Sequence, residues 1–239
     1  MTVEYDGTDF AGWQRQANGP GVQAAIEDAL AGMTGVPTPI RGAGRTDAGV
    51  HALGQVAHFD SDARIPPVGF QRGLNAVLPR AIAILAVEPA APDFDARFSA
   101  RGKLYRYGIW TAPTRSPTRD RYVWHLRRPI DVACMQAAAD LLVGRHDFNA
   151  FRAADCERKT TVRSLSRLAI ARSSDLVTIE VEADAFLKNM VRIIVGTLAE
   201  CGWGKRPPAD LQRILDGRDR RQAGVTAPPQ GLALVRVDY

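Results

Sequence analysis

The sequence predicts an α+β protein that consists of two similar halves, each an antiparallel sheet with helices on one face. Two observations lead to this fold class. Short strand-like runs alternate with amphipathic helical patterns in both halves. In addition, Arg163–Ala171 and Leu176–Ala183 alternate apolar and polar residues, as expected of a half-exposed antiparallel pair. The length of 239 residues, 46% of them hydrophobic and 24% charged, suits one large folded domain or two moderate ones.

The first half is expected to have the element order β-α-β-β-α-β. Apolar residues at helical spacing predict one helix over Gly21–Met33 and a second over Pro67–Val77. The expected strands are Met1–Tyr5, Thr38–Ala43, Gln55–Asp60 and Ala81–Glu88. This order is the split β-α-β arrangement of ferredoxin-like and RNA-recognition-motif (RRM) folds.

The second half repeats the pattern more loosely. Besides the alternating pair, its expected strands are Phe98–Trp110, Tyr122–Leu126 and Leu232–Val237. A helix should begin at Asp131, an N-cap residue, and run to about Val143, with Cys134, Ala138, Leu141 and Leu142 facing inward. Further helices are expected over Phe186–Cys201 and Pro208–Leu215. The boundary near Arg97–Arg101 gives two halves, 1–98 and 99–239.

Composition argues against a membrane or secreted protein. No apolar run approaches the roughly 18 to 20 residues that span a bilayer. The N-terminal residues show no basic region followed by an apolar segment, so we do not expect a secretory signal. Cys134, Cys156 and Cys201 lack both metal-ligand spacing and a disulfide pattern, which predicts a reducing, cytoplasmic environment.

The charge balance favours an anionic partner such as RNA. The chain contains 31 Lys and Arg residues and 26 Asp and Glu residues, which gives a net charge of +5. Only Lys103, Lys159, Lys188 and Lys205 are lysines. Arginine binds phosphate in planar, bidentate geometry, but a GC-rich genome is the better explanation of the arginine bias. The cations between Arg101 and Arg163 would follow an RNA backbone or form an ordinary solvated surface.

The most informative segment is the glycine-rich stretch Gly42–His51, with the sequence GAGRTDAGVH. Its glycines permit a sharp turn and a close approach by a ligand, while Arg45 and Asp47 are presented outward. A carboxylate there can act as a nucleophile, a general base or a plain turn cap. There is no second acid at motif spacing, so a glycosidase with paired carboxylates is poorly supported.

Other residues with functional potential have ordinary structural explanations. His51 and His58 lack Cys or carboxylate partners at ligand spacing, so we interpret them as structural and expect no metal site. The four tryptophans could stack on bases, but core packing is the expected role of each: Trp13, Trp110, Trp124 and Trp203.

Seven segments, in order along the whole chain, carry a family resemblance. They are the stretch Gly42–His51 together with Glu4–Gln16, Asn75–Pro79, Phe94–Ser99, Lys103–Tyr107, Phe186–Arg192 and Gly231–Tyr239. Their sequences resemble those of the TruA family of tRNA pseudouridine synthases. The resemblance implies the pseudouridine synthase fold, with a central cleft, and isomerisation of uridine to pseudouridine at positions 38–40 of the tRNA anticodon stem-loop. It implies no cofactor, and it implies a homodimer in which each tRNA contacts both subunits.

The resemblance also assigns roles to single residues. Asp47 would be the catalytic aspartate that acts on a flipped uridine, and the ring of Tyr105 would pack on the uracil. Arg192 would pair with Asp47 and keep it ionised. Arg45 would help to displace the target base or would hold a phosphate. Taken alone, Tyr105 fits a core aromatic residue, Arg192 a helix cation and Arg45 a surface loop cation.

Two other classes of protein are compatible with parts of the pattern. A non-catalytic RNA-binding protein could use the same two-half fold, since split β-α-β sheets often present aromatic platforms to bases. That alternative leaves the Arg45 and Asp47 loop unexplained. A nucleosidase or glycoside hydrolase would use a carboxylate but would release free uracil.

Overall fold

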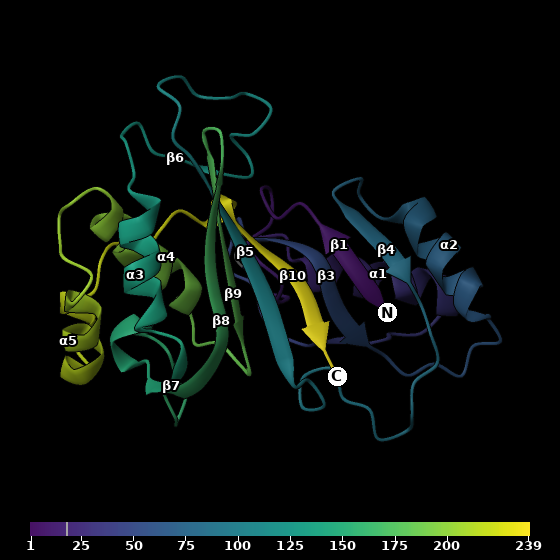
Figure 1. The fold of residues 1–239 in the computed structure, drawn as a ribbon. Coiled ribbons are helices and arrows are strands. Elements are labelled where there is room, and N and C mark those ends of the chain that lie inside the picture. Colours follow the sequence, from purple (N-terminus) through teal and green to yellow (C-terminus); the bar gives the residue numbers. More distant parts are fainter. Residues whose placement is uncertain (18) are drawn as a thin grey trace. The chain divides into compact units, whose positions relative to one another are not determined.

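The computed structural model describes residues 1–17 and 19–239, which form two compact units (Figure 1). The first unit comprises Met1–Arg101 together with Ala233–Tyr239, and the second comprises Gly102–Leu232. The chain passes from the first unit to the second after Arg101. The closing residues 233–239, which the sequence placed with the second half, group with the first unit instead.

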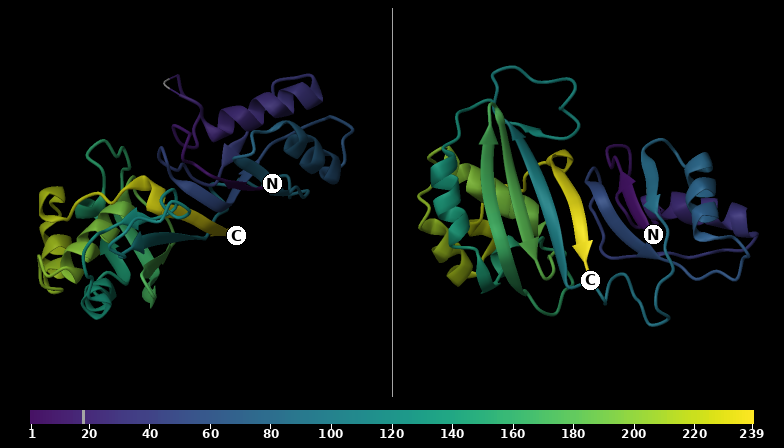
Figure 2. Two further views of the ribbon diagram at one scale, coloured as in Figure 1. Left: turned by 90° about the horizontal axis from the view of Figure 1, so that it is seen from above. Right: turned by 45° about the vertical axis from the view of Figure 1, so that its right-hand side comes forward.

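The first unit has the predicted element order and forms an antiparallel sheet. In chain order its elements are β1 (Thr2–Tyr5), α1 (Val22–Thr34), β2 (Arg41–Gly42), β3 (His51–His58), α2 (Pro67–Val77) and β4 (Ile82–Ala86). The strands lie in the order β4, β1, β3, with β2 also paired to β3. Both helices lie on the same face of this sheet (Figure 2). The arrangement is that of a split β-α-β fold.

Besides β1, strand β3 pairs with two strands that are far from each other in sequence, β2 and the last strand, β10 (Leu232–Asp238). Near its end, Ala57 and His58 pair with β2. Near its start, His51 and Ala52 pair in parallel with Ala233 and Leu234 of β10. The last strand in the sequence therefore completes the sheet of the first unit.

Two strands of this unit differ from the predicted ranges. The strand predicted over Thr38–Ala43 is reduced to β2, because Pro39 has no N–H to donate to a ladder. Strand β3 begins four residues earlier than Gln55, at His51. The glycine-rich stretch is consequently a short connection between two paired strands.

The second unit contains an antiparallel sheet in the order β5, β9, β8, β7. Its strands are β5 (Gly102–Trp110), β6 (Trp124–His125), which pairs in parallel with β5, β7 (Gly144–Asp147), β8 (Val162–Ser173) and β9 (Leu176–Ala183). Its helices are α3 (Val132–Asp140), α4 (Met190–Gly202) and α5 (Asp210–Gly217). Short 3-10 turns complete it: η1 (Asn149–Phe151), η2 (Arg220–Gln222) and η3 (Pro229–Gly231). Helices α3 and α4 cover one face of the sheet (Figure 1).

The helix predicted to start at Asp131 has the expected cap, since the Asp131 carboxylate accepts a hydrogen bond of 3.0 Å from the backbone N–H of Cys134. The helix ends at Asp140 rather than near Val143. Ala138 and Leu142 are buried as predicted, whereas Cys134 and Leu141 are only half-buried. The sequence did not predict β7, which follows α3 directly.

The helix predicted over Phe186–Cys201 begins only at Met190. Asn189, just before it, has φ of 61°, a left-handed conformation that a right-handed helix cannot contain. Residues Phe186–Asn189 therefore form a separate segment at the start of α4. Almost every residue of α4 is buried, so this helix is the centre of the second unit's core. In the described part of the chain, no helix has both the length and the apolar character that a membrane crossing requires.

Candidate active site

The connection between β2 and β3 presents Asp47 on a tightly turned backbone. Gly49 has φ of 76°, a conformation that glycine adopts without strain, and the N–H of Val50 donates to the carbonyl of Asp47 at 3.1 Å. Arg45 is exposed, Thr46 is buried and Asp47 is half-buried. The buried Thr46 thus lies between Arg45 and Asp47, two residues that a ligand can reach.

Thr46 is the anchor of this turn. Its hydroxyl is 2.7 Å from the hydroxyl of Tyr5 on β1, and both groups are buried. Its carbonyl accepts a 3.1 Å hydrogen bond from the N–H of Trp13. Gly12 fits against the same carbonyl with φ of 110°, and a Cβ at that position would lie 2.6 Å from the oxygen. The residue that precedes Asp47 is therefore fixed on both its side chain and its backbone.

The two ends of the turn are also fixed. The side chain of Gln55, fully buried in β3, donates to the carbonyl of Gly44 at 2.8 Å. The N–H of Gly49 donates to the carbonyl of Phe10 at 3.3 Å. A carboxylate on such a backbone is held in place before any ligand binds, which is the condition for efficient catalysis by a positioned group.

The histidines and tryptophans have structural contacts. The Nδ1 atom of His51 accepts from the N–H of Gly7 at 3.0 Å, and that of His58 accepts from the N–H of Ala96 at 3.0 Å. Trp13 is buried against Gly42, and Trp124 meets Trp203 edge to face. Among residues 1–17 and 19–239, no three His, Cys, Asp or Glu side chains are grouped so that they could hold a metal ion.

Tyr105 lies on β5 in the second unit and is 7% exposed. Its ring meets that of Phe186 edge to face, with centroids 5.0 Å apart and an interplanar angle of 83°. Phe186 belongs to the segment that precedes α4. Phe186, the first residue of that segment, therefore fixes the orientation of the Tyr105 ring.

Arg192 lies in the first turn of α4, where the helix dipole opposes a cation. Neutral acceptors hold it there: Nε donates to the carbonyl of Ala227 at 2.8 Å and Nη1 to the side-chain oxygen of Asn189 at 2.9 Å. In return, the N–H of Ala227 donates to the carbonyl of Arg192 at 3.0 Å. Arg192 is half-buried, so its side chain has a defined direction rather than a solvated one.

Tyr107 is a further residue of this neighbourhood that the sequence did not single out. Its hydroxyl donates to the carbonyl of Pro228 at 2.7 Å, next to Ala227. Gly231 packs against the same ring, and a Cβ there would lie 2.4 Å from its Cζ. Burial raises the pKa of Tyr107, and the nearby Arg192 acts in the opposite direction. Tyr105 and Tyr107 are two apart on a strand and share a face, which is the signal that could have identified Tyr107.

The predicted site residues thus form two groups. Arg45 and Asp47 lie in one turn of the first unit, while Tyr105 and Arg192 lie in the second unit, joined through the segment Phe186–Asn189. The ion pair between Asp47 and Arg192 stays a prediction.

Comparison with known families defines the class of protein. The family model described as tRNA pseudouridine synthase matches residues 1–99 and 138–239, which include Asp47 and Arg192. The chain is thus that of an RNA-modifying isomerase that forms pseudouridine.

Relatives align over the full length of the chain, including the strand of Tyr105 that the family model leaves out. A tRNA pseudouridine synthase A of Geotalea uraniireducens is 50% identical, covering 100% of this chain and 98% of its own. Those of Syntrophotalea carbinolica and Myxococcus xanthus are each 48% identical, with 100% of this chain and 95% and 91% of their own covered. The chain belongs to the tRNA pseudouridine synthase family, whose members isomerise uridine to pseudouridine in tRNA.

The Tyr5 and Thr46 pair can be tested by the change Tyr5→Phe. Loss of the buried hydrogen bond should lower the free energy of unfolding by about 1 kcal/mol at neutral pH. It should also lower kcat, by at most about 100-fold, the cost of a displacement of ~1 Å. Burial raises the pKa of Tyr5 above its usual value of 10.0, so the wild type loses stability as pH rises above that value. The stability difference between wild type and Tyr5→Phe should therefore shrink in alkaline solution.

Tyr239→Phe is the matched control, because Tyr239 also donates a hydrogen bond within the first unit, to the carbonyl of Ala96, and burial also raises its pKa. Urea titrations between pH 7 and 11 and initial rates on a tRNA transcript measure both effects. Equal kcat values for Tyr5→Phe and Tyr239→Phe would show that the pair does not position Asp47.

Proposed function

We propose that this chain converts uridine to pseudouridine at positions 38–40 of the tRNA anticodon stem-loop, with Asp47 as the catalytic carboxylate. The observation that supports the proposal most directly is the anchoring of Thr46, because it fixes the residue next to Asp47 from Tyr5, Gly12 and Trp13 at once. A turn that only connected two strands would not need three such contacts from another part of the unit.

The reaction exchanges one bond for another. The bond between N1 of uracil and C1′ of the ribose breaks, the uracil turns while it is held, and C5 bonds to C1′. C5 then loses its proton, and N1 gains one. Substrate and product are isomers, so the reaction consumes neither an oxidant nor an energy source. Asp47 would attack the base, attack C1′ or remove a ribose proton, each of which requires an ionised carboxylate at a fixed position.

The other residues serve to bind and orient the nucleotide. Tyr105 would pack its ring on the uracil, with Phe186 fixing the orientation of that ring. Arg192 would pair with Asp47 and keep it ionised. Arg45, exposed on the same turn as Asp47, would displace the target base or hold a phosphate. Taking a base out of the stack costs a few kcal/mol, a cost that a loop or stem-end nucleotide reduces.

We further propose that the enzyme is a cytoplasmic homodimer and that each tRNA contacts both subunits. Its three cysteines are free thiols, which agrees with a reducing compartment.

The role of Asp47 is tested by Asp47→Ala. This variant should form no pseudouridine on an unmodified tRNA transcript, while its affinity for the transcript stays close to that of the wild type, since phosphate contacts dominate affinity. Asp28→Ala, an exposed carboxylate of α1 in the same unit, is the control and should retain full activity. The assay should quantify pseudouridine and free uracil together. Normal product formation by Asp47→Ala would remove Asp47 from the mechanism, and released uracil would indicate a nucleosidase.

The pairing of Arg192 with Asp47 is tested by comparing Arg192→Gln with Arg192→Lys. Both variants lose the hydrogen bonds to Ala227 and Asn189, but only Arg192→Gln loses the charge. If the cation pairs with the carboxylate, kcat/KM should fall further in Arg192→Gln than in Arg192→Lys, because only the latter retains a positive charge. Equal losses in the two variants would argue against the pair.

The homodimer is tested by light scattering at the enzyme concentration of the activity assay. The expected mass is twice the 26.0 kDa of one chain. An active species with the mass of a single chain would contradict this part of the proposal.

A further inference from the structure

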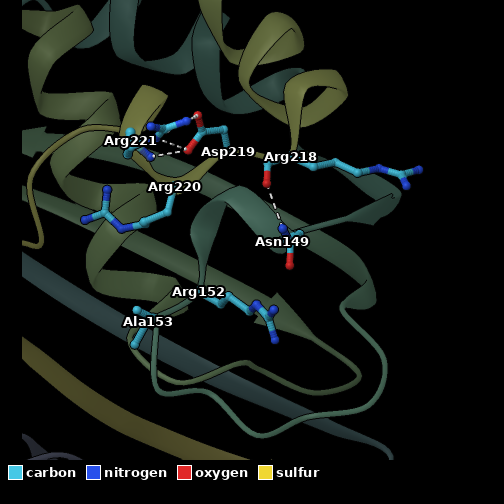
Figure 3. Close-up of a pocket in the computed structure, with 8 residues that line it drawn as sticks. Asn149, Arg152, Ala153, Arg218, Asp219, Arg220 and Arg221 are labelled. Atoms are coloured by element: carbon cyan, nitrogen blue, oxygen red, sulfur yellow. Dashed lines mark hydrogen bonds and ion pairs between the residues drawn. The ribbon is translucent and has the colours of Figure 1, made fainter.

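An open pocket of about 420 Å³ lies in the second unit, between η1 and η2 (Figure 3). Four arginines line it, against one acidic residue, Asp219: Arg152, Arg218, Arg220 and Arg221. The other lining residues are Asn149, Ala153 and Ala154, so the pocket has an excess of positive charge. A hollow of this composition is suited to an anion rather than to an apolar ligand.

The four arginines are not equally neutralised. Arg218 contacts Asp147 at 3.2 Å and Arg221 contacts Asp219 at 2.8 Å. In contrast, Arg152 donates to the carbonyl of Cys156 at 3.0 Å, which is a neutral group.

Arg220 likewise donates only to neutral oxygens, the carbonyls of Ala223 and Gly224 and the hydroxyl of Thr226. Within the described residues, neither Arg152 nor Arg220 has a carboxylate at ion-pair distance. Each guanidinium carries five N–H donors, so both retain donors for a ligand. Burial lowers the pKa of Arg220, and the nearby carboxylate of Glu200 acts in the opposite direction.

The walls of the pocket are fixed before any ligand binds. The side-chain amide of Asn149 donates to the carbonyl of Arg218 at 2.7 Å and joins one wall to the other (Figure 3). Arg218 ends α5 with φ of 50°, and the Asp219 carboxylate caps η2 by accepting from the N–H of Arg221 at 2.9 Å. A preformed site of this kind loses little conformational entropy when a ligand binds.

Both walls continue to Arg192. From one wall, the N–H of Ala153 donates to the carbonyl of Lys188 at 3.0 Å, and the next residue, Asn189, accepts from Arg192. On this side, the pocket wall is therefore hydrogen-bonded to the residue that directly precedes Asn189, an acceptor of Arg192.

From the other wall, Arg220 holds Gly224 and Thr226, and the following residue, Ala227, accepts from Arg192. The segment Gly224–Ala227 packs closely on α4. The N–H of Gly224 donates to the hydroxyl of Thr197 at 2.9 Å. A Cβ on Gly196 would lie only 1.8 Å from the carbonyl oxygen of Val225. Movement of either wall would shift an acceptor of Arg192.

We propose that this pocket binds a backbone phosphate of the tRNA substrate, outside the nucleotide that is modified, and that the bound phosphate steadies the two segments that position Arg192. The proposal rests on the proposed function. A polyanion fits better than a small metabolite because Arg218 and Arg221, at the rim, are 65% and 90% exposed and can continue the contact along a strand. Guanidinium groups also match phosphate oxygens in bidentate geometry.

The test uses Arg152→Gln, Arg221→Gln and the double variant of the full chain. The dissociation constant for an unmodified tRNA transcript is measured over a series of KCl concentrations. Each lost phosphate contact should weaken binding and lower the slope of log Kd against log salt by about 1. Arg152→Lys, which retains the charge, should keep the wild-type slope. Arg213→Gln, an exposed arginine of α5 outside the pocket, is the control and should also keep it.

A second measurement identifies the phosphate and guards against a purely structural effect. Single methylphosphonate substitutions in the transcript remove one backbone charge at a time. At the phosphate that the pocket binds, the substitution should weaken binding to the wild type but not to the double variant. Thermal unfolding checks that the variants remain folded.

Unchanged affinity and salt slope in the folded double variant would overturn the proposal. So would saturable binding of inorganic phosphate that depends on Arg152 and Arg221 while the tRNA slope stays at the wild-type value, because the pocket would then be a small-anion site. Failure of the proposed function is a separate result: the wild type would make no pseudouridine, whatever the salt slopes of the variants.

Discussion

The buried contact between Tyr5 and Thr46 is the constraint on which the site in the first unit depends. A single carboxylate accelerates a reaction only when it is held at the reacting atom, and Asp47 follows directly after the residue whose hydroxyl and carbonyl are both bonded. Gly12 allows the backbone to approach that carbonyl closely, and Gly49 allows the turn to close behind Asp47. The glycines thus allow the backbone of the turn to adopt its conformation, while hydrogen bonds from Tyr5 and Gln55 hold the turn in place.

In the second unit, the arginine Arg192 is held at a helix start, where the helix dipole disfavours a cation. Arg192 lies at the start of an almost entirely buried helix and is held by two neutral oxygens, from Asn189 and Ala227. Arg152 and Arg220 also donate to neutral oxygens, and the segments that hold these oxygens continue to Asn189 and Ala227, the acceptors of Arg192. The second unit therefore supports the arginine at the start of α4 and the arginine pocket with the same segments.

Local patterns in the sequence predicted the fold class, the element order of the first unit and the Asp131 cap, because each depends on neighbouring residues. They could not predict where α4 begins, since the left-handed conformation of Asn189 follows from tertiary contacts. Asp47, Tyr105 and Arg192 were proposed from family resemblance, and their roles stay predictions. Tyr107 and the arginine pocket were missed, because Pro228 is far from Tyr107 in sequence and Arg218–Arg221 are far from Arg152. Contacts of that kind carry no periodic signal.

The pairing of β10 with β3 has a consequence for biosynthesis. Strand β3 and the turn that bears Asp47 leave the ribosome early, but the strand that covers the start of β3 is translated only after the whole of Gly102–Leu232. Until then, His51 and Ala52 expose an open sheet edge, which is a site for mispairing with other nascent chains. Maturation of the turn that bears Asp47 is thereby tied to the translation of β10 rather than to the folding of its own segment.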